Sequence, residues 1–102
     1  MYARNVSIHL KPNMLSDYTR TFENDVLPLL RKQNGFKDEI AFSGSGETDV
    51  TAISLWDNKA NAEAYNNNIY REVVKTLARV MDGTPQVQSG EVVNSTIHQA
   101  TA

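Results

Sequence analysis

The sequence predicts an α+β fold whose strands and helices follow one another in the order β-α-β-β-α-β. Two segments, 2–10 and 36–43, alternate with the two-residue period of a β-strand. Two others, 15–30 and 70–81, space their apolar residues as one face of a helix does. In this ferredoxin-like arrangement we expect a four-stranded antiparallel sheet with helices on one face.

Length and composition limit the classes of protein that the chain can form. Its 102 residues suit one domain, expected over 1–98 with a flexible tail at 99–102. The formal net charge of −2 predicts no general attraction to nucleic acid or to an anionic membrane. The chain has no cysteine, which excludes disulfides and cysteine nucleophiles. No apolar run reaches the roughly 20 residues of a membrane span and no signal peptide is visible, so we expect a cytoplasmic protein.

The first strand and the helix after it have clear sequence signals. Alternation divides the side chains of the strand into two sets: Tyr2, Arg4, Val6, Ile8 and Leu10 face one way, and Ala3, Asn5, Ser7 and His9 the other. Asn13 suits the N-cap of the helix. Pro28 has no N–H for the helical hydrogen-bond ladder, so we expect a kink or break just before it. Gly35 suits a left-handed cap at the end.

The next two strands are expected to pair as a hairpin. The second strand covers 36–43, residues 44–49 have the composition of a turn, and the third strand covers 50–56. Strict alternation divides the side chains of each strand between the two faces of the sheet. In the second strand, one face is expected to carry Phe36, Asp38, Ile40 and Phe42, and the other Lys37, Glu39 and Ala41. In the third strand, one face is expected to carry Ile53 and Leu55, and the other Ala52, Ser54 and Trp56.

The rest of the chain predicts two helices and a strand. Asp57 or Asn58 is expected to cap a short helix that ends at Tyr65. A longer helix begins at Tyr70. The last strand is expected over 86–98, which at about a dozen residues is much longer than the usual five or six.

Two of these features predict a homodimer. One sheet face is expected to expose five apolar side chains that no segment is left to cover: Val6, Ile8, Leu10, Ile53 and Leu55. The long last strand could also pair with the sheet edge of a neighbouring subunit. Both features are explained if two sheets pack face to face. An ordinary long strand with a frayed end is the alternative.

Three stretches of the chain carry a family resemblance: the first strand with Asn5 and Lys11-Pro12, the helix Val26-Leu27-Pro28-Leu29-Leu30 running into Gly35-Phe36, and Ile53-Ser54-Leu55-Trp56-Asp57. With them the sequence resembles the antibiotic biosynthesis monooxygenase family of dimeric α+β barrels, from Tyr2 to about His98. The resemblance implies a homodimer with a pocket between each sheet and its helices. The family includes oxygenases that oxidise polycyclic phenols or quinols without metal or flavin, haem-degrading enzymes, and proteins of unassigned activity.

The residues themselves also favour a pocket under the helices. The sheet face opposite the apolar one is expected to combine a large Trp56 with small side chains: Ala3, Asn5, Ser7, Ala52 and Ser54. Small side chains beneath a helix layer leave a cavity or bring the helices close, and both alternatives are open. A cavity with an aromatic wall and an amide would suit a flat, partly polar ligand such as a small aromatic molecule.

The resemblance gives Asn5 a role, because it matches a strand asparagine near bound ligand in the haem-degrading branch. That branch's helix tryptophan corresponds to Tyr65 here, and its haem-ligating histidine falls at or next to Lys75, so haem degradation is disfavoured. The branch that oxidises polyketide phenols has an asparagine four residues before the strand tryptophan, where this chain has Ala52. No histidine or carboxylate spacing indicates a metal site, and we expect neither metal nor cofactor.

The function expected from these residues is cofactor-independent monooxygenation of an aromatic or quinol-type molecule. Asn5, Tyr65 and His9 are the candidate catalytic residues, with Asn5 orienting a substrate oxygen and Tyr65 or His9 assisting proton transfer. Trp56 would stack on the substrate. Ser7, Ser54 and Ala52 would line the site. Three of these residues have a structural alternative: Asn5 and His9 could face solvent, and Trp56 could belong to the core. A non-catalytic binding or stress-response protein is the rival function, and haem degradation ranks last.

Overall fold

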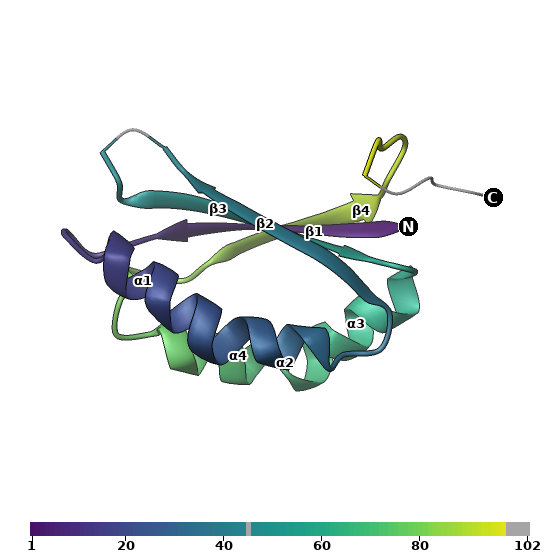
Figure 1. The fold of residues 1–102 in the computed structure, drawn as a ribbon, viewed down its shortest axis with the longest axis horizontal. Helices are drawn as coiled ribbons and strands as arrows, with labels where there is room; N and C mark the ends of the chain where they lie inside the picture. The colour runs from purple at the N-terminus through teal and green to yellow at the C-terminus, as the bar shows by residue number, and fades with distance from the viewer. Residues whose placement is uncertain (45, 98–102) are drawn as a thin grey trace.

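The computed structural model describes residues 1–44 and 46–97, which form one antiparallel sheet with the helices on one face (Figure 1). The strands are β1 (Tyr2–His9), β2 (Phe36–Ser43), β3 (Asp49–Trp56) and β4 (Gln86–Glu91), in the spatial order β2-β3-β1-β4. The predicted ferredoxin-like order β-α-β-β-α-β is confirmed. Along the chain, helices α1, η1 and α2 connect β1 to β2, and α3 and α4 connect β3 to β4.

The first helical region changes geometry just before Pro28, as predicted. It consists of α1 (Leu15–Thr21), a π-helical turn η1 (Phe22–Val26) and α2 (Leu27–Arg31), with Pro28 in the first turn of α2. Because the π turn precedes it, Pro28 lies in the first turn of α2, where its missing N–H costs no helical hydrogen bond. Gly35 has the expected positive φ of 79°. Asn13 does not cap α1: its own φ is 62°, and Met14 occupies the N-cap without a side-chain hydrogen bond.

The first helix of the second helical region extends further along the chain than predicted. Helix α3 (Lys59–Asn68) is capped by Asn58, whose side chain accepts a hydrogen bond from the N–H of Asn61, and it does not end at Tyr65. It continues because the three asparagines after Tyr65 remain on the solvent side, where Asn68 donates to the carbonyl of Ala64 within the helix. Helix α4 (Tyr70–Leu77) follows after the single residue Ile69.

The predicted assignment of the two sheet faces is wrong. Val6 pairs with Ala52, and Arg4 pairs with Ser54, so these residues share one face, and it is the face under the helices. We call this the inner face. The apolar set of β1 is therefore covered, because burying the more apolar face against the helices removes the most hydrocarbon from water. The other set of β1 lies on the outer face with Ile53 and Leu55.

A β-bulge sets the faces of β2. Phe36 pairs with Trp56, but Asp38 pairs with Leu55, so Lys37 is an extra residue in the strand. This shift places Phe36 and Glu39 on the same inner face, although strict alternation predicts opposite faces for them. The same shift turns two large apolar side chains, Ile40 and Phe42, to the outer face, where they are 58% and 57% exposed.

The last strand is shorter than predicted. β4 ends at Glu91, and residues 92–97 are not in a strand. Val92 instead donates its N–H to the carbonyl of Met1, beside the beginning of β1. The remaining part of the predicted strand, His98, and the predicted tail 99–102 lie outside the described residues. An overlong strand therefore gives no support to a dimer.

Candidate functional site

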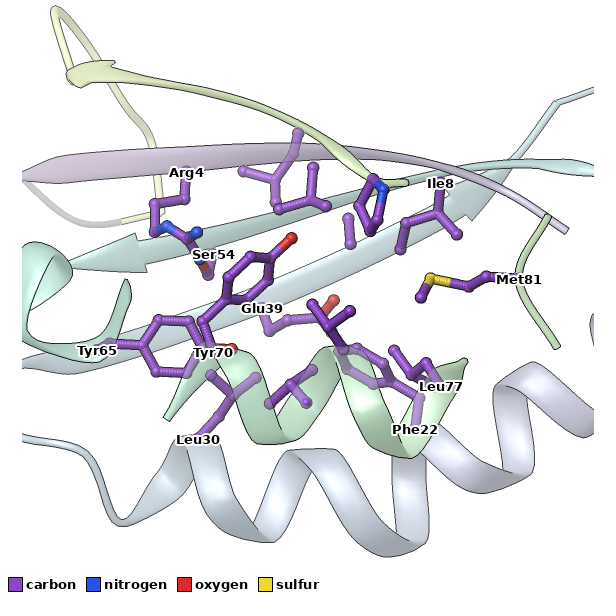
Figure 2. A pocket seen from close by; sticks show the side chains of 16 residues that line it. Arg4, Ile8, Phe22, Leu30, Glu39, Ser54, Tyr65, Tyr70, Leu77 and Met81 are labelled. Carbon is purple, nitrogen blue, oxygen red and sulfur yellow. The ribbon is translucent and has the colours of Figure 1, made fainter. Parts of the chain in front are cut away.

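A small cavity lies between the inner face of the sheet and the helices. It encloses about 40 Å³, room for two or three water molecules. Five polar side chains line it: Arg4, Glu39, Ser54, Tyr65 and Tyr70. Figure 2 shows Arg4, Ser54 and the two tyrosines at one end of the cavity, Glu39 in the middle, and apolar side chains such as Phe22 and Met81 at the other end.

Arg4 is a buried cation with no carboxylate partner. Arg4 is only 3% exposed, and it forms no ion pair within residues 1–44 and 46–97. One guanidinium nitrogen donates to Oδ1 of Asn66 at 2.8 Å. The guanidinium carbon lies 4.5 Å from the ring centre of Tyr70 and 5.1 Å from that of Tyr65, as in cation–π contacts. Burial lowers the pKa of Arg4, but a guanidinium stays protonated at neutral pH.

Glu39 is a carboxyl group that its surroundings do not satisfy. The strand pairing of β2 with β3 places it opposite Ser54, and its Oε2 is buried without a hydrogen-bond partner. Burial raises the pKa of Glu39 to about 7, because the charged form loses its hydration and gains no compensating donor. At neutral pH this carboxyl therefore exchanges a proton readily, which is the property that a general base requires.

Aromatic rings form the wall of the cavity beside Arg4. The ring of Tyr65 lies between those of Trp56 and Tyr70, at centroid distances of 5.0 Å and 6.0 Å. Burial raises the pKa of Tyr65 to about 12, although the nearby guanidinium of Arg4 opposes the rise. The pKa of Tyr70 is raised for the same reason. Both phenols are therefore neutral hydrogen-bond donors at pH 7.

A third phenol lies close to Glu39. The hydroxyl of Tyr18, on α1, is buried without a partner, and burial raises its pKa, with a further rise from the charge of Glu39. Two polar atoms that lack partners are thus present in one apolar region of the core. Buried polar groups are normally paired by protein or water, so an unpaired set indicates a place where a polar ligand or water can bind.

Four of the predicted site residues lie on the inner face or above it. Ser54 and Tyr65 line the cavity directly, and so does Ala52, which pairs with Val6 across the two strands. Trp56 is fully buried and does not line the cavity. Its indole N–H donates to Oγ of Ser54 at 3.0 Å, and its ring supports Tyr65 from behind. The tyrosine rings, and not the tryptophan, form the aromatic wall.

The other three predicted site residues lie on the outer face. Asn5, Ser7 and His9 alternate with the inner-face residues of β1 and point away from the helices. His9 is exposed, with Nδ1 2.8 Å from Oδ1 of Asp49. Oδ1 of Asn5 is buried without a partner on that outer face. The structure therefore does not bring these three together with Trp56 and Tyr65.

Arg4 and Glu39 are the residues that sequence reasoning missed. Arg4 carried a usable signal, because it is the one charged residue in an otherwise apolar set, Tyr2 to Leu10, and a charge in a buried stripe is unusual. Glu39 carried none, because its face depends on the bulge at Lys37, which alternation cannot reveal. Tyr70 was expected to begin the apolar, core-facing side of the helix over 70–81, and was not among the candidate site residues.

The arrangement suits the binding and deprotonation of an acidic hydroxyl group. A carboxyl with a near-neutral pKa can accept a proton, and an unpaired guanidinium with two phenol donors can stabilise the resulting anion in a dry site. A metal site is not indicated: the described residues contain no group of three or more side chains able to hold a metal ion. No helix among them is long and apolar enough to cross a membrane.

Comparison with known proteins supports the fold. No family model and no curated protein matches the sequence. Solved structures do match it. A Bordetella bronchiseptica protein provisionally assigned to the antibiotic biosynthesis monooxygenases superposes with a TM-score of 0.76 and 17% identity, over 90% of this chain and 96% of that one.

Two oxygenases from Streptomyces have the same architecture. A cofactor-independent oxygenase of Streptomyces nogalater gives a TM-score of 0.77 at 9% identity, over 95% of this chain and 97% of that one. A monooxygenase of Streptomyces coelicolor, solved with the ligand nanaomycin D, gives 0.73 at 14% identity, over 92% of each chain. Another matching structure is of unknown function. The chain thus has the α+β barrel fold of the antibiotic biosynthesis monooxygenases, which confirms the resemblance at the level of fold.

Proposed function

We propose that the protein is a small oxygenase that acts without a cofactor on an aromatic hydroxyl compound bound between the sheet and the helices. The observation that carries the proposal is Glu39, a half-buried carboxyl whose Oε2 is buried without a hydrogen-bond partner and whose pKa is raised to about 7, in a cavity lined mostly by apolar side chains. The likeness to oxygenases of the same fold is in agreement with it.

In the proposed reaction, Glu39 accepts the proton of a phenol, quinol or anthrone-type substrate. Arg4, with Tyr65, stabilises the resulting anion. The electron-rich anion then reduces dioxygen itself. For an anthrone, the CH₂ group and O₂ give a carbonyl group and one molecule of water, and the substrate supplies all four electrons. The protein has to deprotonate, hold and desolvate the substrate.

The size of the cavity requires that a substrate ring displace part of the protein. Ligand sites for small molecules usually enclose about 300–1,000 Å³, whereas this cavity encloses about 40 Å³. Tyr70 is the side chain best placed to move, because it begins α4 directly after the one-residue junction at Ile69 and its ring already stacks on Arg4. A substrate ring would take its place.

The test is oxygen uptake with a panel of quinols and anthrones in aerobic buffer. We expect uptake above the buffer blank for at least one compound. Glu39→Gln should lower kcat/KM at least about a hundredfold, because it removes the proton acceptor with little change of shape. Asn5→Ala and His9→Asn, on the outer face, should leave the rate within about twofold. If the outer-face variants lose activity and Glu39→Gln keeps it, the proposed site is wrong.

A non-catalytic binding protein is the second candidate, and the small cavity favours it. Such a protein would bind an aromatic molecule, with quenching of its single tryptophan, Trp56, and would show no oxygen uptake with any compound of the panel. Catalysis and binding are thereby separated in one set of samples.

We also propose that the protein is a homodimer that pairs through the outer face. The apolar residues that support the dimer differ from those expected from the sequence. They are Ile40, Phe42, Ile53 and Leu55, which no element of the described residues covers. The buried and unpaired Oδ1 of Asn5 lies on this face as well. An exposed apolar sheet face with such a group is typical of a subunit interface. Sedimentation at micromolar concentration should give a mass near twice 11.4 kDa.

A further inference from the structure

A second opening reaches Arg4 from outside the cavity. This groove lies between α3 and β4 and encloses about 320 Å³. Its lining is polar for the most part: Tyr2, Arg4, Glu63, Asn66 and Ser89. Arg4 lines both the groove and the inner cavity, so its guanidinium lies between the two spaces.

The guanidinium of Arg4 has hydrogen-bonding capacity that the protein does not use. Asn66 accepts one hydrogen bond, and the neutral phenols of Tyr65 and Tyr70 contact the guanidinium through their rings and hydroxyl groups without neutralising it. A guanidinium has five N–H donors, and a buried charge is costly unless it is paired with an opposite charge. Asn66 is a neutral residue on the exposed surface of α3, so the hydrogen-bond acceptor that faces Arg4 on the groove side carries no charge.

We propose that the ligand is an aromatic carboxylic acid, whose ring enters the inner cavity and whose carboxylate binds Arg4 through the groove. This inference rests on the proposed function only in placing the ring in the same cavity. A carboxylate matches the planar fork of a guanidinium and supplies the missing negative charge. The hydroxyls of Tyr2 and Ser89, 3.4 Å apart, lie on the rim of the groove and can donate to a bound carboxylate.

One group in the groove opposes the binding of an anion. Glu63 lies on the rim and forms an exposed ion pair with Lys59 at 3.7 Å. Its charge is partly compensated by Lys59 and screened by solvent, whereas the interaction with Arg4 is buried. Glu63→Gln should therefore tighten the binding of an acid about twofold and leave the binding of a neutral ligand unchanged.

The test compares 1-hydroxy-2-naphthoic acid with its methyl ester by calorimetric titration in anaerobic buffer. The wild-type protein should bind the acid at least about tenfold more tightly, because only the acid forms a charge-assisted pair with Arg4. Arg4→Met should remove this preference and leave the affinity for the ester within about threefold.

Arg4→Met alters a buried residue, so a surface variant provides an independent test. Asn66→Asp places a carboxylate beside Arg4 and should occupy it, which removes the preference for the acid and raises Tm. Asn67→Asp adds the same charge one residue further along exposed α3, and should keep the preference. Preference retained in Asn66→Asp, or lost equally in both variants, would overturn the assignment of Arg4.

The outcomes also separate this inference from the proposed function. Equal affinity for acid and ester, or no binding of either, overturns the carboxylate site; oxygen uptake with the quinol panel then decides the proposed function alone. Preference for the acid without any oxygen uptake supports the carboxylate site and overturns the proposed oxygenation.

Discussion

The two faces of the sheet are built from the same four strands and differ in how their polar groups are treated. On the inner face, Arg4 is buried beneath helices without a counter-charge, and the half-buried Glu39 has its Oε2 buried without a hydrogen bond. On the outer face, the hydrogen-bonded pair of His9 and Asp49 is exposed to solvent. Ionisable groups that are removed from water without a hydrogen bond or an opposite charge have shifted pKa values. The inner face therefore contains both Glu39, whose pKa is raised, and the cation of Arg4, which has no counter-charge.

The largest expected difference between the faces is in stability. Trp56→Ala removes a side chain that is fully buried on the inner face, and should lower the free energy of unfolding by about 3–5 kcal/mol. Leu55→Ala, at the neighbouring position on the outer face, should cost about 1 kcal/mol, because Leu55 is only partly buried. Urea denaturation of both variants in one oligomeric state measures the difference. Equal losses would mean that the two faces are packed alike.

The next effect concerns association. Phe42→Asp puts a charge into the exposed apolar set of the outer face and should weaken the dimer by about 2–3 kcal/mol, or roughly 30- to 150-fold in Kd. Sedimentation equilibrium measures the change. Glu23→Gln on the exposed surface of η1 is the control and should leave Kd unchanged. A dimer that persists unaltered in Phe42→Asp does not use this face.

A smaller effect is a pH dependence that arises on the inner face. The pKa of Glu39 is raised from 4.5 to about 7 in the folded protein. Between these two pH values the carboxyl keeps its proton in the folded state and has lost it in the unfolded state. Stability from this group is fully present below about pH 4.5 and is lost as the pH rises through 7. Allowing for partial exposure, the loss is about 1–2 kcal/mol.

Glu39→Gln provides the control for that pH dependence. Its amide does not titrate, while Tyr18 and Tyr65, the titratable groups that face Glu39, remain neutral below pH 9 because their pKa values are raised. Urea midpoints between pH 5 and pH 8 should therefore fall in the wild-type protein by more than in Glu39→Gln. Parallel curves for the two proteins would show that Glu39 is solvated.

The smallest effect belongs to the outer face. His9→Asn removes an exposed contact with Asp49 and should change the free energy of unfolding by about 0.5 kcal/mol or less, since exposed polar pairs are screened by water. Thermal unfolding of the two proteins in one buffer measures the change. A loss above about 1 kcal/mol would indicate that His9 is buried in the working assembly, as it would be in a dimer interface.

The fold was predictable from the sequence because its signals are local. The alternation in β1, the proline in α2 and the left-handed glycine at 35 each act through the backbone of a few residues, and they determine element order and boundaries. The length of β4 was overestimated because apolar residues after Glu91 continue an alternating pattern without pairing to another strand.

The site was only partly predictable because it depends on which face of each strand the helices cover. Alternation correctly separated Ala52, Ser54 and Trp56 from their neighbours, but it could not decide which set of β1 lies beside them; strand pairing decides this. For Glu39 the decisive feature is one extra residue in β2, which has no signature in the composition. A charged residue within an apolar stripe, as at Arg4, was a further sign of the site that the alternating pattern offered.

The central claim is that Glu39 is a proton acceptor held in an apolar cavity on the inner face. Its most direct test is an NMR titration of the side-chain carboxyl carbon of Glu39 in protein labelled with ¹³C at glutamate, assigned by comparison with Glu39→Gln. The account predicts that this carbon titrates with a pKa of about 7. Titration near 4.5, the ordinary value for a glutamate, would contradict the claim.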